Sequence, residues 1–360
     1  MNHKSNTNTH TTTQAQSPTK AKCLKLGIDV HADSYRVVRQ FDHATPQPAQ
    51  KFTPQDFLLW AKKQLDQAET VHSCYEAGPF GYGLHRALEA LGIHNVVVRP
   101  QNWDELHKGV KTDKTDALAL VQRLDRYVQG NRRALAVITV PTPEQELARS
   151  QSRQREQLLA HRLRLEAQGR SLLLFNGLRV KGRWWQESRW TTLPSQIPVA
   201  LCELLTVLRD LLLAVQKQLE AATTRLQGAA RPQPCGVGAL TSQVLEREIL
   251  DWKRFANRRQ VASLTGMCPG VRASGLKTRS GPITKHGNRR LRTALIELAW
   301  RCVRFQPDYA PLQRWRPVLL NTKATSAAKK KAIVAVGRRL AIDLWRIHTG
   351  RSTAQKLKLK

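Results

Sequence analysis

Acidic residues are scarce in this sequence of 360 residues: Asp and Glu number 27 against 59 Lys and Arg, which gives a formal net charge of +32 at pH 7. Such an excess is larger than solubility requires, so we expect a polyanionic partner. The excess is concentrated in residues 251–360, which carry +22, against +3 in residues 1–130 and +7 in residues 131–250. The sequence therefore predicts that the C-terminal third makes most of the contacts to the polyanion.

Long apolar runs and paired cysteines are also lacking. No stretch approaches the roughly 18 apolar residues that a bilayer span needs, so we expect no membrane span. Residues 1–22 lack the apolar core and the cleavage site of a secretory signal, and we expect a disordered tail there. The six cysteines contain no C-x-x-C pair, which argues against zinc and against a disulfide framework. We therefore expect reduced thiols in a cytoplasmic protein.

Residues 23–130 alternate between strand and helix patterns. The expected strands are 24–30, 34–41, 70–75 and 94–98, and the expected helices are 54–67, 82–91 and 116–127. Alternation of this kind predicts an α/β domain, with helices packed on a sheet.

Residues 142–228 change to a purely helical pattern. Leucines recur along 144–174 and 199–226, and a Gly- and Pro-containing stretch separates these two long expected helices. They predict an antiparallel coiled-coil arm, although a plain helical hairpin packed on its own domain fits the pattern equally well.

Residues 231–350 predict a mainly α-helical C-terminal domain. Helices are expected at 240–250, 255–264 and 289–305, with a loop punctuated by Gly and Pro at 266–287 and a basic helix beyond 323. Residues 351–360 read as a basic tail.

Four carboxylates stand at the ends of expected elements in the N-terminal region. Asp29 closes the first strand, Glu76 closes a later strand, and Asp113 and Asp116 open a helix. Side chains at strand ends gather at the rim of an α/β sheet, and residues three apart share one side of a helix. Clustered carboxylates repel one another unless cations lie between them, so this pattern predicts Mg²⁺ or Mn²⁺ and a two-metal site for phosphoryl displacement.

Each of these carboxylates also has a simpler explanation. Asp29 fits a turn after a strand, Asp113 fits a helix N-cap, and Glu76 fits a solvated loop. Their shared placement at element ends, in a chain that is otherwise basic, favours a common site.

These residues lie in motifs that resemble a known family. The sequences Gly27-Ile28-Asp29-Val30, Tyr75-Glu76-Ala77-Gly78 and Lys111-Thr112-Asp113-x-x-Asp116-Ala117 resemble the DEDD transposases of bacterial insertion sequences, whose N-terminal domain is similar to the RuvC resolvase and has an RNase H-like fold. The resemblance covers about residues 24–305. In the C-terminal region it is carried by Gly266, Pro269, Ser274-Gly275, Lys277-Thr278-Arg279, Gly281, Ile283-Thr284-Lys285, Gly287-Asn288 and Leu291-Arg292.

The resemblance implies roles for individual residues and partners. Asp29, Glu76, Asp113 and Asp116 would be the metal-binding tetrad, and Ser274 would be the nucleophile. Members of the family are recombinases guided by a structured RNA that the element encodes, so the resemblance implies a guide RNA beside DNA. We also expect a homo-oligomer, either a dimer or a tetramer, with the site completed across subunits.

Basic residues surround the expected serine. A serine hydroxyl attacks phosphorus only if it loses its proton and the developing charge is neutralised. The expected nucleic-acid contacts are Arg272, Lys277, Arg279, Lys285, Arg289, Arg290 and Arg292. From residue chemistry alone, Ser274-Gly275 is equally well explained as a turn, and Ser280 is the nearest competing nucleophile.

Two other functions stay open at this point. A Holliday-junction-type resolving endonuclease would use the same carboxylates without a serine step, and a non-catalytic RNA-binding protein would not need them. Transposition is favoured because neither alternative accounts for the C-terminal motif.

Overall fold

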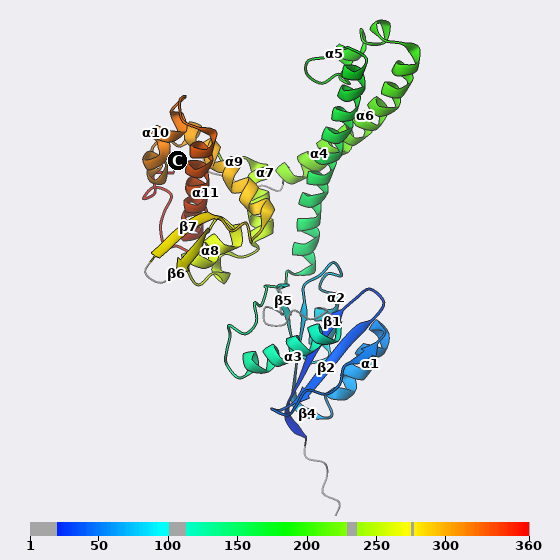
Figure 1. The fold of residues 1–360 in the computed structure, drawn as a ribbon, viewed down its shortest axis with the longest axis vertical. Helices are drawn as coiled ribbons and strands as arrows, with labels where there is room; N and C mark the ends of the chain where they lie inside the picture. The colour runs from blue at the N-terminus through cyan, green and yellow to red at the C-terminus, as the bar shows by residue number, and fades with distance from the viewer. Residues whose placement is uncertain (1–19, 101–112, 229–235, 275–276, 360) are drawn as a thin grey trace, which may run out of the picture. The chain divides into compact units, whose positions relative to one another are not determined.

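The computed structural model describes residues 20–100, 113–228, 236–274 and 277–359, and it describes no side chains for residues 113–114, 272–274 and 277–278. The chain divides into two compact units, Met1–Val140 and Pro141–Lys360. Figure 1 labels the elements of both units.

The N-terminal unit is built on a five-stranded mixed sheet. Its strands are β1 (Ala21–Val30), β2 (Tyr35–Phe41), β3 (Gln50–Phe52), β4 (Ala68–Glu76) and β5 (His94–Val98). Their order is β3-β2-β1-β4-β5; β2 is antiparallel to β1 and β3, whereas β4 is parallel to β1 and β5. The four predicted strands are confirmed, and β3 was missed because three residues are too few to show a period.

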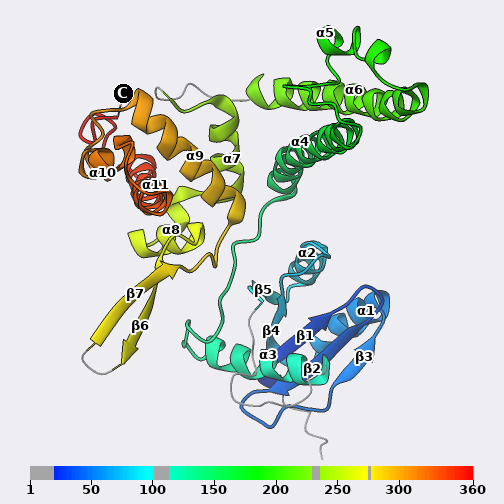
Figure 2. The same ribbon diagram turned by 45° about the horizontal axis from the view of Figure 1, so that its top comes forward.

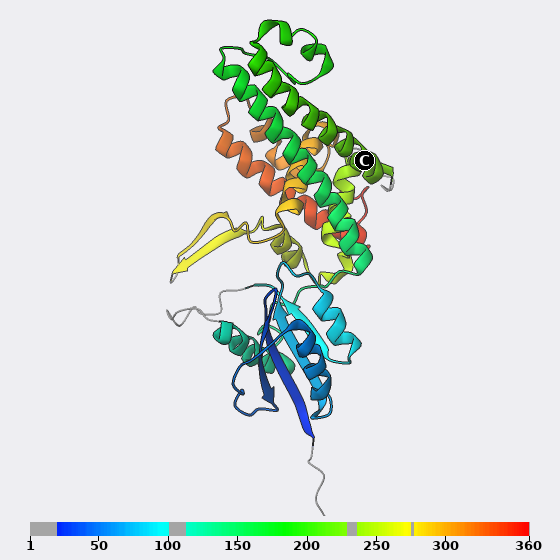
Figure 3. The same cartoon turned by 90° about the vertical axis from the view of Figure 1, so that its right-hand side faces the viewer.

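Helices cover both faces of this sheet. On one face, Leu26 and Ile28 of β1 share a core with Phe57 of α1 (Pro54–Gln64) and Leu88 of α2 (Gly83–Ala90). On the other face lies α3 (Asp113–Val128). Figure 3 shows the sheet nearly edge-on, with α3 on one side and α1 and α2 on the other. The predicted α/β layering is therefore confirmed.

The N-terminal boundary of the unit differs from the prediction. Residues 1–19 of the expected tail lie outside the described residues, but Ala21 and Lys22 already belong to β1. Their pairing explains the difference, because Ala21 aligns with Ala68 at the start of β4.

The second unit begins with two long helices, α4 (Pro143–Phe175) and α6 (Val199–Gly228). They run antiparallel, because Leu173 near the end of α4 packs with Leu205 near the start of α6, while Arg155 near the start of α4 donates to Thr223 near the end of α6 at 2.8 Å. The short elements α5 (Glu187–Trp190) and η1 (Pro194–Gln196) lie between them. The two predicted helices are confirmed, and supercoiling of the pair stays a prediction.

The remainder of the second unit is mainly helical. Its elements are α7 (Ala239–Ile249), η2 (Trp252–Arg254), α8 (Arg258–Thr265), β6 (Pro269–Ser274), β7 (Lys277–Ile283), α9 (Arg289–Phe305), α10 (Ala310–Leu320) and α11 (Ser326–His348). Their core includes Leu295 and Leu298 of α9 and Val336 and Leu340 of α11. Leu359 joins the same core, so the expected basic tail is packed at its end.

Three expectations for this region need correction. Residues 266–287, expected as a loop, contain the antiparallel hairpin of β6 and β7. The hairpin has no alternating apolar side to reveal it, and Figure 2 shows it extending away from the helices. The helix expected from 255 begins at Arg258, because the side chain of Asn257 accepts the backbone N–H of Arg259 at 2.9 Å. Helix α10 was not predicted.

Within the described ranges, no helix is both long and apolar enough to cross a membrane. The five cysteines in those ranges are free thiols, as the spacing predicted.

A glycine sets the distance between β1 and α3. A Cβ atom on Gly27 would lie 2.4 Å from the carbonyl oxygen of Ala117 and 2.5 Å from the backbone nitrogen of Val121. Both are backbone atoms, so a side chain at position 27 could be accommodated only by moving the helix.

We predict that Gly27→Ala destabilises the N-terminal unit by about 2 kcal/mol, since overpacking of this kind typically costs about 1–3 kcal/mol. Urea unfolding of the whole chain, with hydrogen exchange followed at β1, measures the loss. Gly83→Ala is the matched control, because nothing lies within 4 Å of a Cβ at that position. Equal stability of the two variants would contradict the prediction.

Candidate functional site

Two of the predicted carboxylates lie side by side at one end of the sheet. Strands β1 and β4 are parallel neighbours, and Ile28 is paired with Tyr75. The next residue of each strand is Asp29 and Glu76. The register therefore brings these two residues together at the carboxyl ends of adjacent strands, as the sequence predicted.

Both carboxylates belong to the face of the sheet that α3 covers. Ile28 and Tyr75 pack into the core on the opposite face, and side chains alternate along a strand, so Asp29 and Glu76 point to the α3 side. The Cys74 thiol, also on this side, is fully buried; burial raises its pKa, and the charge of Glu76 raises that pKa further. The charge of Glu76 thus acts on a thiol that is buried beneath α3.

The start of α3 lies above the same part of β1. Ala117 is packed on Gly27, two residues before Asp29. Asp116 immediately precedes Ala117 in the first turn of α3, is half-buried and has a buried Oδ1 atom. Asp113 is the first residue of α3, and its side chain lies outside the described ones. The fold thus brings the backbones of separate motifs to one edge of the sheet.

A histidine that the sequence reasoning missed contacts this edge. Nε2 of His31 lies 3.0 Å from Oδ2 of Asp29. The Asp29 side chain is 19% exposed and the His31 side chain 50% exposed, so the pair is accessible from solvent. The spacing of two residues across a tight turn was the signal available in the sequence. His31 can hold the Asp29 carboxylate in one orientation.

The donor set at this edge has the chemistry of a site for a hard cation. Asp29, Glu76 and Asp116 offer carboxylate oxygens, which are the ligands that Mg²⁺ and Mn²⁺ prefer. Among the described side chains, no three His, Cys, Asp or Glu residues lie close enough together to hold an ion. The side chain of Asp113 is not among them, so the tetrad of metal ligands stays a prediction.

The second candidate region is the β6–β7 hairpin. Ser274 is paired with Lys277 as the outermost registered pair, next to residues 275–276, which are not described. Ser280 is paired with Val271, further back along the hairpin. The two serines that compete as nucleophile therefore occupy different levels of one hairpin, with Ser274 at its outer end.

The predicted basic residues divide into several groups. Arg272 is paired in register with Arg279, which is exposed, and the side chains of Arg272 and Lys277 are not described. Lys285 and Arg289 are also exposed. The exposed members of this set are available to a polyanion.

Two of the basic residues that were predicted to contact nucleic acid instead bind other groups of the protein. Arg290 forms an ion pair with Glu156 of α4. Nη1 of Arg292 donates to the backbone carbonyls of Thr265 at 3.1 Å and Lys285 at 3.3 Å, on the two sides of the hairpin base. Arg292 therefore has a structural role that the sequence did not indicate.

A buried carboxylate, Glu248 of α7, connects the long helix α4 to the start of α9. Its side chain is 2% exposed; Oε1 lies 3.3 Å from Nε of Arg153, and Oε2 lies 3.4 Å from Nη2 of Arg149. Nδ2 of Asn288 donates to Oε2 at 2.6 Å, and the side chain of Asn288 caps α9 by accepting the backbone N–H of Leu291. One side chain thus contacts elements on α4 and at the start of α9.

Sequence reasoning missed Glu248, although a signal was present. Glu248 shares the buried face of its helix with Leu245 and Ile249, so a carboxylate stands where the pattern calls for an apolar residue. Burial by itself raises the pKa of Glu248. Hydrogen bonds from Arg153 and Asn288, with the charges of Arg153 and Arg149, outweigh burial and hold the pKa below its ordinary value near 4.5.

We predict that Glu248→Gln destabilises the second unit by about 3 kcal/mol at neutral pH, because it leaves two partly buried arginines without their counter-charge. Urea unfolding measures the change. Glu203→Gln, at an exposed position on α6, is the control and should stay within about 0.5 kcal/mol of wild type. A loss no larger than that of the control would contradict this account.

The same carboxylate predicts a pH dependence. Because the folded-state pKa of Glu248 is lowered, its contribution to stability is fully present above its ordinary pKa near 4.5 and is lost as the pH falls through the lower, folded-state pKa. We expect wild type to lose stability relative to Glu248→Gln as the pH is lowered below that value, measured by urea unfolding at a series of pH values. Parallel profiles for the two chains would contradict it.

Comparison with known proteins gives a consistent result. The sequence model described as "Transposase IS116/IS110/IS902 family" matches residues 234–312. The chain is 34% identical over 300 residues to a protein of Sinorhizobium fredii that is named as a transposase, y4rJ, and the match covers 75% of each chain. It is 23% identical over 339 residues to the transposase for insertion sequence element IS1328 of Yersinia enterocolitica, covering 90% of this chain and 96% of the relative.

Proposed function

The chain belongs to the IS116/IS110/IS902 family of transposases, and we propose that it cleaves and rejoins DNA strands with the carboxylates of its N-terminal unit and a serine of its C-terminal unit. The observation that carries this proposal is the parallel register of β1 and β4, by which Asp29 and Glu76 end adjacent strands beneath the start of α3. The mixed sheet with helices on both faces supports the RuvC-like, RNase H-like assignment of this unit.

Asp29, Glu76, Asp113 and Asp116 would hold Mg²⁺ or Mn²⁺, which when bound stabilises the oxygens of a phosphoryl group during displacement. The protein's own part is to fix the carboxylates from three segments at one edge of the sheet. His31 orients Asp29 through the 3.0 Å contact. The four carboxylates would make the chain a transposase of the DEDD type.

Ser274 at the outer end of the hairpin would supply the nucleophile. Attack of its Oγ on a backbone phosphorus forms an Oγ–P bond and breaks one P–O bond of the strand, while the hydroxyl proton leaves and the released strand end takes up a proton. Arg279 and Lys285 are exposed near the hairpin, and with Arg272 and Lys277 they would neutralise the charge that develops on the phosphate. Attack by the hydroxyl of a second strand reverses the step and joins the new ends.

DNA is the proposed polyanionic partner, and the +22 charge of residues 251–360 supports its binding to the C-terminal unit. The family resemblance supports a guide RNA as a second nucleic-acid partner. We further propose that two or four copies assemble, with the carboxylates and the serine brought together across subunits.

We predict that Ser274→Ala abolishes a covalent protein–DNA species while leaving DNA affinity within about twofold of wild type, because the change removes one oxygen atom and no charge. Denaturing gel electrophoresis with labelled DNA detects the adduct, in the presence of RNA recovered with the purified protein. Ser280→Ala is the matched control, since it lies on the same hairpin and should keep the adduct.

An adduct that persists in Ser274→Ala and disappears in Ser280→Ala would move the nucleophile to Ser280. DNA cleavage that continues without an adduct in either chain would instead support a resolving endonuclease. Asp29→Ala should abolish both cleavage and adduct formation, and an unchanged activity would contradict the role of the carboxylates.

A further inference from the structure

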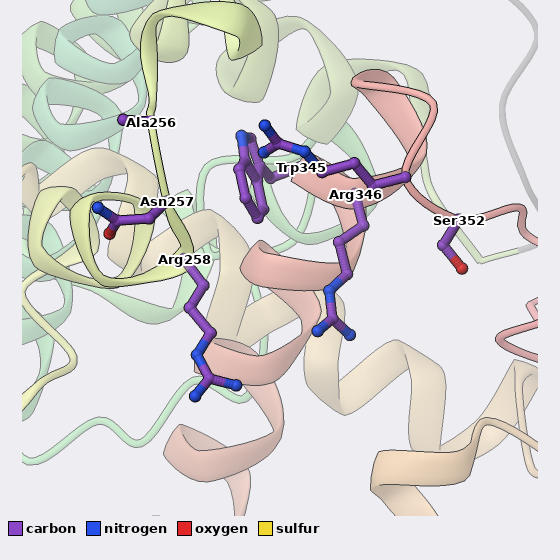
Figure 4. A pocket seen from close by; sticks show the side chains of 7 residues that line it. Ala256, Asn257, Arg258, Trp345, Arg346 and Ser352 are labelled. Atoms are coloured by element: carbon purple, nitrogen blue, oxygen red, sulfur yellow. The ribbon is translucent and has the colours of Figure 1, made fainter.

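A cavity of about 430 Å³ lies on the second unit, between the start of α8 and the end of α11. Arg258 is the first residue of α8, and Trp345 and Arg346 belong to the last turns of α11; Arg351 and Ser352 follow that helix. Figure 4 shows the side chains of Arg258 and Arg346 extending in the same direction on neighbouring elements. None of these residues belongs to the carboxylate motifs or to the hairpin.

The cavity carries an excess of positive charge. Arg346 contributes its Nη1 to an ion pair with Asp343 at 3.2 Å, but this buried carboxylate is also shared with Arg339 and accepts the Tyr309 hydroxyl. Among the described residues, no carboxylate lies within ion-pairing distance of Arg258 or Arg351. Within the described part of the fold, Arg346 therefore has a counter-charge in Asp343, whereas the guanidinium groups of Arg258 and Arg351 have none.

Trp345 also lines the cavity through its ring. Trp345 is 5% exposed, and its indole Nε1 has no hydrogen-bond partner within the described part of the chain. The guanidinium carbon of Arg351 lies 4.3 Å from the centre of the Trp345 ring, so the indole holds this arginine at the cavity wall.

The first turn of α8 adds to the positive electrostatic potential at the cavity. Its N-cap residue, Asn257, lines the cavity, and the N-terminus of a helix carries a partial positive charge. Three guanidinium forks, a hydroxyl at Ser352 and a helix N-terminus form a donor-rich, acceptor-poor wall. Guanidinium groups match the geometry of a phosphate bidentately, so phosphate is the ligand chemistry that this wall fits.

We infer that this cavity binds a phosphate of the DNA backbone, at a position distinct from the hairpin that carries Ser274. The hairpin follows the C-terminal end of α8, whereas the cavity lies at its N-terminal end. The inference rests on the proposed function only for the identity of the polyanion. Contacts of this kind fix the register of a protein on DNA and carry no sequence information themselves.

The test measures binding of the full chain to a labelled DNA duplex by fluorescence anisotropy at a series of salt concentrations. We expect Arg258→Gln/Arg351→Gln to weaken binding by about tenfold or more at low salt and to reduce the slope of log K against log salt by about 1, because one phosphate contact is lost. Arg259→Gln is the matched control, because Arg259 is exposed on the same helix and does not line the cavity. The control should change affinity less than threefold.

Arg258→Lys/Arg351→Lys separates charge from geometry. Lysine keeps the charge but lacks the fork, so the salt slope should be retained while part of the affinity is lost. We would also measure the melting temperature of every variant, with and without inorganic phosphate. A shift in melting temperature with phosphate that the Gln variant loses, together with unchanged DNA affinity, would overturn the inference in favour of a free-phosphate site.

The outcomes separate this inference from the proposed function. If wild type binds DNA with a steep salt dependence and the Gln variant matches it, the cavity assignment is overturned and the proposed function stands. If wild type binds no DNA, both are overturned. Weakened binding to single-stranded RNA with unchanged binding to DNA would also overturn the assignment to DNA.

Discussion

The parallel pairing of β1 with β4 is the constraint on which the N-terminal site depends. Pairing in one register places Asp29 beside Glu76, and a shift of one residue would turn one of them to the opposite face. The apolar residues on the α1 and α2 side favour that register, because a shift of one residue would turn either Ile28 or Tyr75 away from the core that they share. The packing on one face of the sheet thus determines which polar groups meet on the other.

In the second unit, a network of buried polar side chains holds the base of the hairpin in place. Glu248 joins the long helix α4 to the cap of α9, and Arg292 closes the two sides of the hairpin base. Gly287 makes this closure possible, since a Cβ there would lie 2.5 Å from the backbone nitrogen of Gly266. The hairpin that carries Ser274 is therefore anchored at its base.

The elements that could be predicted from the sequence are those with a periodic pattern of apolar residues. Strands β1, β2, β4 and β5 and the helices α4, α6 and α9 were found because each buries one periodic set of side chains. Strands β6 and β7 were missed because their sequence shows no alternation of apolar and polar residues. Asp29 and Glu76 could be placed at one edge from strand ends alone. Glu248 and His31 left a signal in the sequence, a carboxylate among apolar positions and a spacing of two residues, but the signal did not identify their partners. Arg351 becomes informative only through its contact with Trp345.

The sharing of Glu248 between α4 and α9 has a mechanical consequence. Arg149 and Arg153 stand one turn apart on α4, so a rotation of that helix about its axis would withdraw both guanidinium groups from the carboxylate at once. Glu248 would then keep the hydrogen bond from Asn288 but lose the counter-charge of both arginines. A ligand that rotates α4 would therefore also act on the buried carboxylate that the N-cap residue of α9 contacts.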